Sequence, residues 1–591
     1  MTIAPVEDVY DSRLALDATG LLRTFNEGGV VDAVDVHVAR RLTTLAGETD
    51  ESVALAVAVA VRAVRGGSVC VDLRGLADEP VPDGDSPPPT WPAVEEWTAA
   101  IAASPLVADP PVLRLEGGLL YLDRYWREEE QVCADLLGRP ATEPLDAAAR
   151  AALDAGLARV FPDEGYDEQR TAAGIALTQR TTVLTGGPGT GKTTTVAALL
   201  ALLTEQAEVA GRPPLRMALA APTGKAAARL QQAVQAEILK LGSNDRARLS
   251  GLQAVTLHRL LGSRPDTSAR FRHHRDNRLP HDVVVVDETS MVSLTMMARL
   301  LEAVRLESRL ILVGDPDQLT SVEAGAVLAD LVDGLGARSD TRIAALTTSH
   351  RFGESIRRLA ASVRAGDADQ VLDLLHAGGQ HVELVTDPDP VPVLRTVLLP
   401  HALRLRDAAE RDDRDAALAL LDAQRLLCAH REGPHGVHHW NRLVERWISE
   451  HTGVGIWSSW YPGRPILVTA NDYGLGLYNG DTGVAVRRGT GLRAALDASS
   501  GPLDLATSRL GDVDTMHAMT IHKSQGSQAD EVTVLMPPED SRLLTRELFY
   551  TAITRARDKV RVVGSEAEVR AAVARQAVRA TGLRARLRET R

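Results

Sequence analysis

Residues 184–196 read Leu-Thr-Gly-Gly-Pro-Gly-Thr-Gly-Lys-Thr-Thr-Thr-Val, and the eight positions from Gly186 to Thr193 match the pattern G-x-x-x-x-G-K-[ST]. A short apolar run at 182–184 precedes the glycines, and a helical run at 196–203 follows them. Strand, loop and helix in this order are the context that a phosphate-binding loop requires. Backbone N–H groups of such a loop point into one concavity, and the helix adds the positive end of its dipole. The stretch therefore predicts an α/β fold with a polyphosphate site.

Two side chains of this loop have expected roles. Lys192 would reach the β- and γ-phosphates of ATP, and the Thr193 hydroxyl would hold Mg²⁺. A glycine-rich turn without a ligand is the simpler interpretation, and the joint match of eight positions disfavours it. The residues expected to surround the nucleotide here are Gly186, Gly187, Pro188, Gly189, Thr190, Gly191, Lys192, Thr193 and Thr194.

The chain has 591 residues, which is too many for one hydrophobic core and suggests several domains. Its 44% apolar and 25% charged residues are typical of a globular protein. No apolar run is long enough to span a membrane, and the acidic N-terminus is unlike a secretory signal. Three widely separated cysteines argue against a disulfide framework and a zinc site. We expect a protein of the reducing cytoplasm, with no membrane partner.

The formal net charge is −13, but a nucleic-acid channel needs only a local basic lining. Arginines gather at 262–282 and in the C-terminal tail at 575–591. Each group fits a nucleic-acid contact or a solvated face, and both interpretations stay open.

Residues 1–150 are expected to form a separate, mostly helical domain with a small β segment at 68–73. We find no catalytic motif in them. The stretch 119–126 carries three aromatic residues, although the whole chain is only 3% aromatic. They are either a core anchor or a docking surface for another protein.

Further polar groups follow strand-like runs downstream of the loop. Four valines at 283–286 predict a buried parallel strand, and Asp287 and Glu288 stand at its carboxyl end, where ligands bind in open α/β sheets. Asp287 would hold Mg²⁺ through water, and Glu288 would polarise the attacking water. Gln318, after a strand at 310–313, suits a sensor of the γ-phosphate.

Three more residues are weaker candidates when each is taken alone. Gln169, ahead of the phosphate loop, would hydrogen-bond the adenine edge. Arg351 and Arg555 would each stabilise charge on the transferred phosphoryl group.

The second half repeats the alternation of strands and helices without a second phosphate loop. Histidines at 430–439 have no convincing metal-ligand spacing, so metal binding is disfavoured there. The stretch 457–514 is rich in glycine and short β runs, and Asn479-Gly480 is a strong hairpin signal. We expect a small β-barrel inserted in the second half.

The order of the motifs is more specific than any one of them. After the phosphate loop come Pro-Thr-Gly-Lys-Ala at 222–226, Asp-Glu-Thr-Ser at 287–290, Gly-Asp-Pro-Asp-Gln-Leu at 314–319, Ser-His-Arg-Phe at 349–352, Thr-Ile-His-Lys-Ser-Gln-Gly at 520–526 and Tyr-Thr-Ala-Ile-Thr-Arg-Ala at 550–556. In this order they resemble the motifs of superfamily 1 helicases, and Val-Asp-Glu-Thr-Ser-Met at 286–291 is similar to the RecD branch. The resemblance covers roughly residues 160–565.

The resemblance implies two RecA-like parallel-sheet lobes, at 151–345 and 346–591, with ATP and Mg²⁺ between them. It also implies a small pin near 262–282, an SH3-like β-barrel insert at about 457–514, and 5′-to-3′ movement along single-stranded DNA. Gln169 would read adenine, and Arg351 and Arg555 would be arginine fingers. The residues implied to lie near DNA, or to couple it to ATP, are Thr223, Lys225, His258, Thr520, His522 and Lys523.

Within the RecD family two types remain open. One works with RecB-like and RecC-like subunits in the RecBCD exonuclease V complex, which processes double-stranded DNA ends. The other is a longer stand-alone helicase. The N-terminal region lacks a helix-hairpin-helix glycine pattern and favours the first type, in which this region docks on companion subunits. A third interpretation is a structural subunit that binds ATP but has little motor activity. The intact Lys192, Glu288 and Arg555 argue against it. No nuclease site is expected in this chain.

Overall fold

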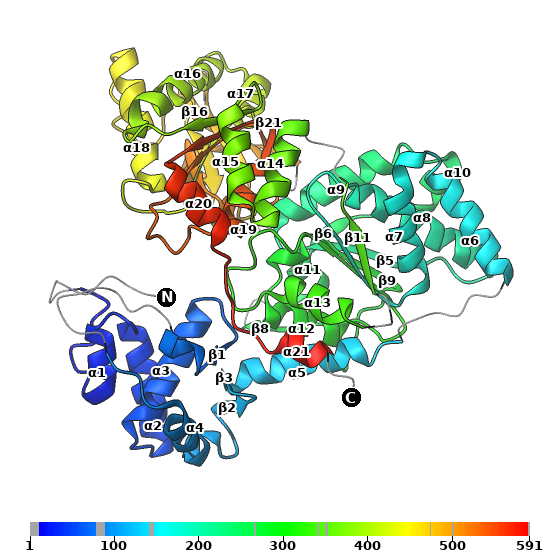
Figure 1. Ribbon diagram of the computed structural model, residues 1–591. Coiled ribbons are helices and arrows are strands. Elements are labelled where there is room, and N and C mark those ends of the chain that lie inside the picture. The colour runs from blue at the N-terminus through cyan, green and yellow to red at the C-terminus, as the bar shows by residue number, and fades with distance from the viewer. Residues whose placement is uncertain are drawn as a thin grey trace.

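A computed structural model describes residues 11–78, 89–140, 147–264, 267–338, 340, 342–348, 353–472, 474–498 and 501–588. Three bodies follow one another along the chain in Figure 1: an N-terminal domain, a first α/β lobe and a second α/β lobe. The last helix returns from the second lobe to the first.

The N-terminal domain combines helices with a small antiparallel sheet in the order β1-β3-β2. Its elements are α1 (Gly20–Glu27), α2 (Ala33–Ala46), α3 (Glu51–Arg65), β1 (Cys70–Asp72), α4 (Val94–Ala103), β2 (Leu113–Glu116), β3 (Leu119–Leu122) and α5 (Asp123–Leu137). Helix α3 is apolar around most of its surface and lies at the centre of the core. The Asp50 carboxylate caps it by accepting from the Ser52 N–H.

Lobe 1 is a six-stranded parallel sheet in the order β11-β4-β10-β9-β5-β6. The strands are β4 (Thr181–Gly186), β5 (Met217–Ala221), β6 (Ala254–Thr256), β9 (Val283–Val286), β10 (Arg309–Gly314) and β11 (Ile343–Leu346). The four valines of β9 are all buried, as predicted for a central strand with both faces covered.

Helices cover both faces of this sheet. One face carries α6 (Ala147–Val160), α7 (Asp167–Thr178), α8 (Lys192–Val209) and α9 (Gly224–Ile238), with α10 (Ser243–Arg248) beside them. The other carries α11 (Leu257–Leu261), α12 (Leu294–Ala303) and α13 (Val327–Gly336), together with α5 of the N-terminal domain. The N-terminal domain thus shares a hydrophobic core with lobe 1.

A two-stranded antiparallel ribbon projects where a pin was expected, formed by β7 (Ser263–Arg264) and β8 (Thr267–Phe271). It follows α11 directly. Phe271 is buried in the core of lobe 1 and anchors the base of the ribbon.

Lobe 2 is a five-stranded parallel sheet in the order β12-β21-β20-β13-β19. The strands are β12 (Val382–Val385), β13 (Gln424–Cys428), β19 (Ala518–Thr520), β20 (Ala529–Leu535) and β21 (Ala556–Val563). The helices around it are α14 (Glu354–Ala365), α15 (Ala368–Ala377), α16 (Pro390–Glu410), α17 (Arg414–Leu421), α18 (Val437–Thr452), α19 (Arg546–Ile553) and α20 (Glu566–Ala574). Two parallel-sheet α/β lobes are therefore present, as predicted.

Between α18 and β19 lies a five-stranded antiparallel sheet with its own hydrophobic cluster. Its strands are β14 (Pro465–Val468), β15 (Thr482–Arg488), β16 (Gly491–Ala498), β17 (Gly501–Ala506) and β18 (Val513–Thr515). Asn479-Gly480 does not form a tight two-residue hairpin loop. It stands near the end of the longer connection 469–481, called the insert loop below, which joins the antiparallel pair β14 and β15.

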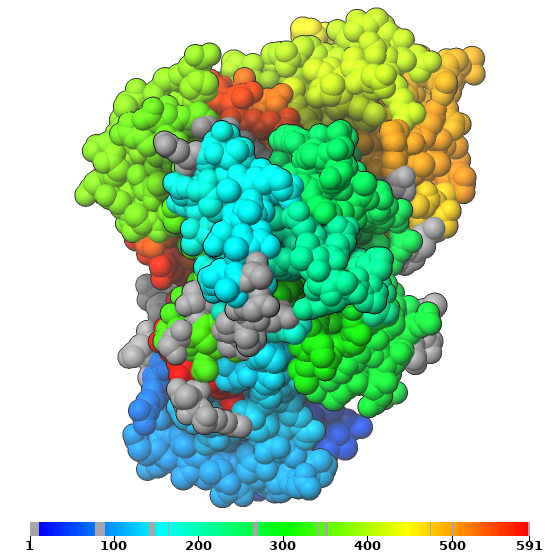
Figure 2. All heavy atoms as spheres, turned by 90° about the vertical axis from the view of Figure 1, so that its right-hand side faces the viewer, coloured from blue at the N-terminus to red at the C-terminus, as the bar shows by residue number. Residues whose placement is uncertain are grey.

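The described part of the chain ends with α21 (Leu583–Arg588), which packs against α13 of lobe 1 and α5 of the N-terminal domain (Figure 1). In the space-filling view of Figure 2 the two lobes lie one above the other, with the N-terminal domain beneath lobe 1. Among the described residues, no helix is both long and apolar enough to cross a membrane.

Candidate functional site

The phosphate loop connects the buried strand β4 to the N-terminus of α8. Gly189 and Gly191 have φ angles of 81° and 87°, a region that glycine adopts without strain. The Thr190 hydroxyl donates to the Gly187 carbonyl at 2.9 Å and braces the loop from within. The backbone is thus held in the curved form that presents N–H groups to an anion.

Lys192 is the first residue of α8, and its ammonium group turns back onto the loop. Nζ donates to the carbonyl oxygens of Gly186 at 2.5 Å and Gly187 at 2.9 Å. Both are backbone acceptors, so the positive charge of Lys192 remains available to a bound anion.

The two predicted acids stand at the carboxyl end of β9. The Asp287 N–H donates to the Ala220 carbonyl of the neighbouring strand at 2.9 Å, which fixes the start of the turn. Burial, with the neighbouring Glu288 charge, raises the pKa of Asp287 to about 6. Glu288 has φ 51° and ψ 41°, a left-handed conformation that costs a non-glycine residue about 1–3 kcal/mol. Such strain is typical of functional positions.

Polar contacts join the two lobes beside these acids. The buried Gln318 side chain donates from Nε2 to Asp315 Oδ2 at 2.9 Å and accepts at Oε1 from Arg555 Nη2 at 3.1 Å. Arg555 follows α19 of lobe 2, and its Nε donates to the Thr551 carbonyl at 3.0 Å. The predicted sensor and one predicted arginine finger are therefore in direct contact across the cleft.

Most of the predicted nucleotide residues line one cavity of about 800 Å³ between the lobes. Those that line it are Gln169, Pro188, Gly189, Gly191, Lys192, Thr193, Thr194, Asp287, Glu288, Gln318 and Arg555. Gly186, Gly187 and Thr190 lie behind the loop surface and support Lys192 and the loop. Arg351 lies outside the described residues.

Gln169 on α7 supplies a test of whether a nucleotide fits here. Its Nε2 donates to the Thr190 carbonyl at 2.9 Å, whereas its buried Oε1 has no hydrogen-bond partner among the described residues. A buried acceptor without a donor is costly unless a ligand supplies one. The amino group of adenine is such a donor, so the Gln169 acceptor at this end of the cavity fits the base.

Sequence reasoning missed several residues of the cleft. Asp315 is buried and also accepts from Tyr550 OH of lobe 2 at 3.1 Å. Arg229 of α9 also lines the cavity. Gln525 Nε2 donates to the Leu319 carbonyl at 2.8 Å, a further bond between the lobes. Asp315, Tyr550 and Gln525 stand within the recognised motifs, but their partners are far away in the chain.

A larger groove of about 1320 Å³ lies at the amino ends of the lobe 1 strands, between α6 and α8. None of the predicted site residues lines it. The predicted site residues therefore gather around the smaller cavity between the lobes.

Three of the predicted DNA residues gather around the insert loop. Thr223 caps α9 by accepting from the Ala226 N–H, and burial lowers the pKa of Lys225 to about 8. Tyr478 packs so closely on the same turn that a Cβ atom on Gly224 would lie 2.5 Å from the Tyr478 Cβ. From lobe 2, Lys523 Nζ donates to Asn479 Oδ1 at 2.8 Å.

The other candidates lie in different surroundings. Thr520 Oγ1 accepts from the Lys523 N–H at 3.3 Å, and His522 is half-buried beside it. His258 of α11 packs edge-on against Phe271 at the base of the ribbon, with ring centroids 5.7 Å apart. The structure thus brings Thr223, Lys225 and Lys523 to the insert loop and leaves His258 beside the ribbon.

Similar known proteins match nearly the whole chain. A family model for the RecBCD enzyme subunit RecD, N-terminal domain, matches residues 27–121. Models for an AAA domain and a UvrD-like helicase C-terminal domain match residues 169–324 and 515–563. RecBCD enzyme subunit RecD of Mycobacterium tuberculosis strain ATCC 25618 / H37Rv is 66% identical over 586 residues, which are 98% of this chain and 99% of that protein.

The chain belongs to the RecD family. The ATP-dependent RecD2 DNA helicase of Deinococcus radiodurans is 31% identical over 84% of this RecD-family chain but only 62% of its own length. The crystal structure of Bacteroides Pif1 bound to ssDNA covers 67% of the RecD-family chain and 91% of its own, at 16% identity and a TM-score of 0.37.

Proposed function

We propose that this chain is the ATP-driven 5′-to-3′ DNA helicase subunit of a RecBCD-type enzyme that processes double-stranded DNA ends for recombinational repair. The observation that carries the proposal is the cavity between the lobes. Lys192, Glu288 and Gln318 of lobe 1 share it with Arg555 of lobe 2, so closure of the cleft and completion of the ATP site are one event.

Each residue of the cavity would have its own role in ATP hydrolysis. Lys192 and the loop N–H groups bind the β- and γ-phosphates, and Glu288 orients the attacking water. Thr193 and Asp287 would hold Mg²⁺, whose preference for oxygen ligands fits a hydroxyl and a carboxylate. The ion would supply charge neutralisation between the phosphates. Among the described residues no cluster of three or more metal-ligating side chains exists, so phosphate oxygens and water would complete its shell.

Gln318 and Arg555 would report the state of the γ-phosphate to lobe 2. In the structure they hydrogen-bond each other. A bound γ-phosphate offers both of them an anionic acceptor and would close the cleft more tightly. Its loss after hydrolysis would release lobe 2, and each ATP would then drive one cycle of closing and opening. We assign Arg351 the role of a second arginine finger on the motif resemblance alone.

DNA would pass across both lobes and be held by its backbone, which makes movement independent of sequence. We propose contacts from Thr223, Lys225 and His258 of lobe 1 and from Thr520, His522 and Lys523 of lobe 2. The five-stranded insert at about 457–514 would be an SH3-like barrel, and the ribbon within 262–282 would be the pin. The 5′-to-3′ polarity rests on the family resemblance.

The partners would be RecB-like and RecC-like subunits. The N-terminal domain, 1–150, would dock on them, while lobes 151–345 and 346–591 form the motor. Coverage of 99% of mycobacterial RecD but 62% of RecD2 supports the complex-forming type over the stand-alone helicase.

The test is Lys192→Ala, made in the full chain with its companion subunits. Without the ammonium charge the phosphates lose their main side-chain partner, and we expect ATP hydrolysis by this chain to fall at least about 100-fold. Because ATP hydrolysis by the companions would mask this loss, the readout is unwinding of a duplex with a 5′ tail, compared with one that has a 3′ tail.

Lys559→Ala is the matched control. Lys559 forms an ion pair with Glu383 in lobe 2, away from the cavity, and its loss should leave unwinding unchanged. Normal unwinding of the 5′-tailed duplex by Lys192→Ala would overturn the site assignment. Loss of unwinding from the 3′ tail alone would overturn the polarity.

A further inference from the structure

Residues 575–588, called the strap below, leave lobe 2 after α20 and cross to lobe 1 (Figure 1). On the lobe 2 side, the Arg575 carbonyl accepts from the Arg546 N–H at 2.8 Å. The Ala577 N–H donates to Glu547 Oε2, also at 2.8 Å. Val578 follows with 87% of its surface exposed. The strap passes from one lobe to the other at this single residue.

Arg579 begins the part that is bound to lobe 1. Its Nη1 donates to the carbonyl oxygens of Ser321 at 2.6 Å, Glu323 at 3.1 Å and Gly325 at 3.4 Å. The same guanidinium packs on Gly67 of the N-terminal domain, where a Cβ atom would lie 2.8 Å from Arg579 Cζ. Gly325 also donates its N–H to the Gly67 carbonyl at 2.9 Å. Arg579 thus lies where the strap, lobe 1 and the N-terminal domain meet.

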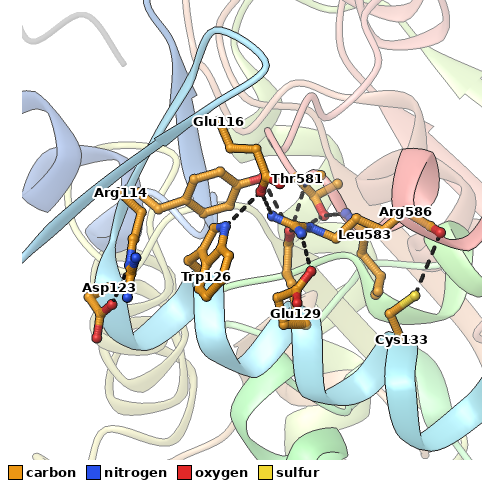
Figure 3. A network of polar contacts seen from close by, with 12 residues as sticks. Arg114, Glu116, Asp123, Trp126, Glu129, Cys133, Thr581, Leu583 and Arg586 are labelled. Carbon is orange, nitrogen blue, oxygen red and sulfur yellow. Dashed lines mark hydrogen bonds and ion pairs between the residues drawn. The ribbon is translucent and has the colours of Figure 1, made fainter. Parts of the chain in front are cut away.

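Beyond Arg579 the strap is clamped by charge. Glu129 of α5 is fully buried and accepts from Thr581 Oγ1 at 2.7 Å and from the Gly582 N–H at 3.0 Å. Arg586 donates to Glu129 at 3.4 Å and to Glu130 at 2.5 Å, and it also pairs with Glu116 (Figure 3). A buried carboxylate with this many donors strongly penalises detachment of the strap.

Apolar contacts hold the same end. Leu583 and Leu587 are buried in the core that lobe 1 shares with α5. A Cβ atom on Gly334 of α13 would lie 2.7 Å from Leu587 Cβ, which shows how closely α21 is seated. The strap from Arg579 onward therefore moves with lobe 1 and the N-terminal domain.

The loop that Arg579 holds begins at Gln318, which lines the cavity between the lobes. Ser321 follows the sensor Gln318 by three residues. Burial lowers the pKa of His258, and the charge of the Glu323 carboxylate acts against this shift. Burial also lowers the pKa of His522, and the charge of Arg579 lowers it further. Arg579 therefore holds, at Ser321, the loop that follows the sensor Gln318.

We propose that Arg579 is a positioning residue that couples cleft movement to the sensor loop, residues 318–325. The inference rests on the proposed helicase function. One residue spans at most about 3.6 Å, so Val578 gives the strap almost no slack. When lobe 2 moves away, it pulls Ala577 and thereby Arg579 and the three carbonyls it binds. Lobe 2 must pivot at Val578 or shift the loop that follows Gln318.

The test compares Arg579→Ala and Arg579→Lys in the full chain with its companions, in a background where the companion motor is inactivated. We expect Arg579→Ala to lower DNA-stimulated ATP hydrolysis and base pairs unwound per ATP at least about fivefold. Hydrolysis without DNA and the KM for ATP should stay within about twofold, because Arg579 does not line the cavity. Since one nitrogen makes all three bonds, the lysine variant should restore at least about half of the coupling.

Arg588→Ala is the matched control, because Arg588 is an exposed arginine of the same strap. Unchanged coupling in Arg579→Ala would overturn the proposal. An equal fall in hydrolysis with and without DNA would overturn it too, because that pattern indicates a purely structural role. Failure of the unaltered chain to hydrolyse ATP would instead overturn the proposed function.

A second variant tests the proposed coupling even if Arg579→Ala does not fold. Two glycines inserted after Val578 preserve every contact of Arg579 and add slack of up to about 7 Å. We expect base pairs unwound per ATP to fall at least about threefold while hydrolysis without DNA is retained. Full coupling in the insertion variant would refute the mechanical link.

Discussion

The cleft between the lobes and the junction around the strap are held together by different forces. Across the cleft, Gln318 bonds Arg555 and Asp315 bonds Tyr550, both at 3.1 Å, with Leu319 as an apolar contact in the core of lobe 2. At the junction, Leu583 and Leu587 are buried and Glu129 is enclosed. Water or a phosphate can replace polar partners, whereas exposing apolar surface costs about 25 cal/mol per Å². The cleft is suited to repeated opening and the junction to remaining closed.

The largest effect is expected at the cleft. Arg555→Ala removes the contact to Gln318 and the charge that we propose faces the phosphates, and we expect kcat for ATP hydrolysis to fall about 1000-fold, as for an arginine finger. Nucleotide binding should be retained, since Lys192 and the loop remain. Steady-state kinetics and a fluorescent ATP analogue measure the two quantities.

Arg557→Ala is the control for this change, because Arg557 is nearby but forms an exposed pair with Asp530. If both variants lost activity equally, the bond across the cleft would have no special role.

The next effect is expected at the junction. Leu587→Ala leaves a cavity against α13, and we expect the strap to lose about 3 kcal/mol of local stability. Amide exchange in α21 would then accelerate about 100-fold, while ATP binding in the cleft stays unchanged. Hydrogen exchange with mass spectrometry measures both regions at once. Leu16→Ala, at an 80% exposed position, is the control. Loss of ATP binding together with faster exchange would show that the two regions are not independent.

The smallest effect concerns pH. Asp287 has a pKa of about 6 and would have to be ionised to hold Mg²⁺, so we expect kcat/KM for ATP to fall about tenfold per pH unit below 6. Its pKa is raised above the value in the unfolded chain, so its contribution to stability is present at low pH and is lost as pH rises through 6. Titration of this group therefore lowers activity on acidification without unfolding the cleft.

A pH profile recorded beside thermal melting curves tests this separation. Asp317→Asn is the control, because burial raises the pKa of Asp317 to about 6 but Asp317 does not line the cavity. If the pH profile shifted in Asp317→Asn, the titration would belong to Asp317 and not to Asp287.

Much of the motor was predictable from short stretches of chain. The strand at 283–286 matches β9 residue for residue, and Asp287 and Glu288 follow it at the edge where ligands bind. The phosphate loop joins β4 to α8 as expected. These predictions succeeded because a buried parallel strand and a glycine-rich loop have strong local signals.

Other features left no such signal. The bond between Asp315 and Tyr550 joins residues that are 235 positions apart. Neither of the two motifs that contain them indicates that they are in contact. Of the aromatic stretch at 119–126, Tyr121 is a core residue, while Trp126 donates to Glu116 and stacks near Arg586. The choice between core anchor and docking surface depended on what packed against it.

The sequence alone determined the two lobes and the phosphate loop, because periodicity and motif spacing are properties of neighbouring residues. Only the tertiary structure decided what the arginine-rich tail does. Arg579 and Arg586 are neither a solvated face nor a nucleic-acid lining in this structure, since they bind Ser321, Glu129 and other groups of distant segments. A charge selects its partner by burial and geometry, and both arise when segments hundreds of residues apart pack together.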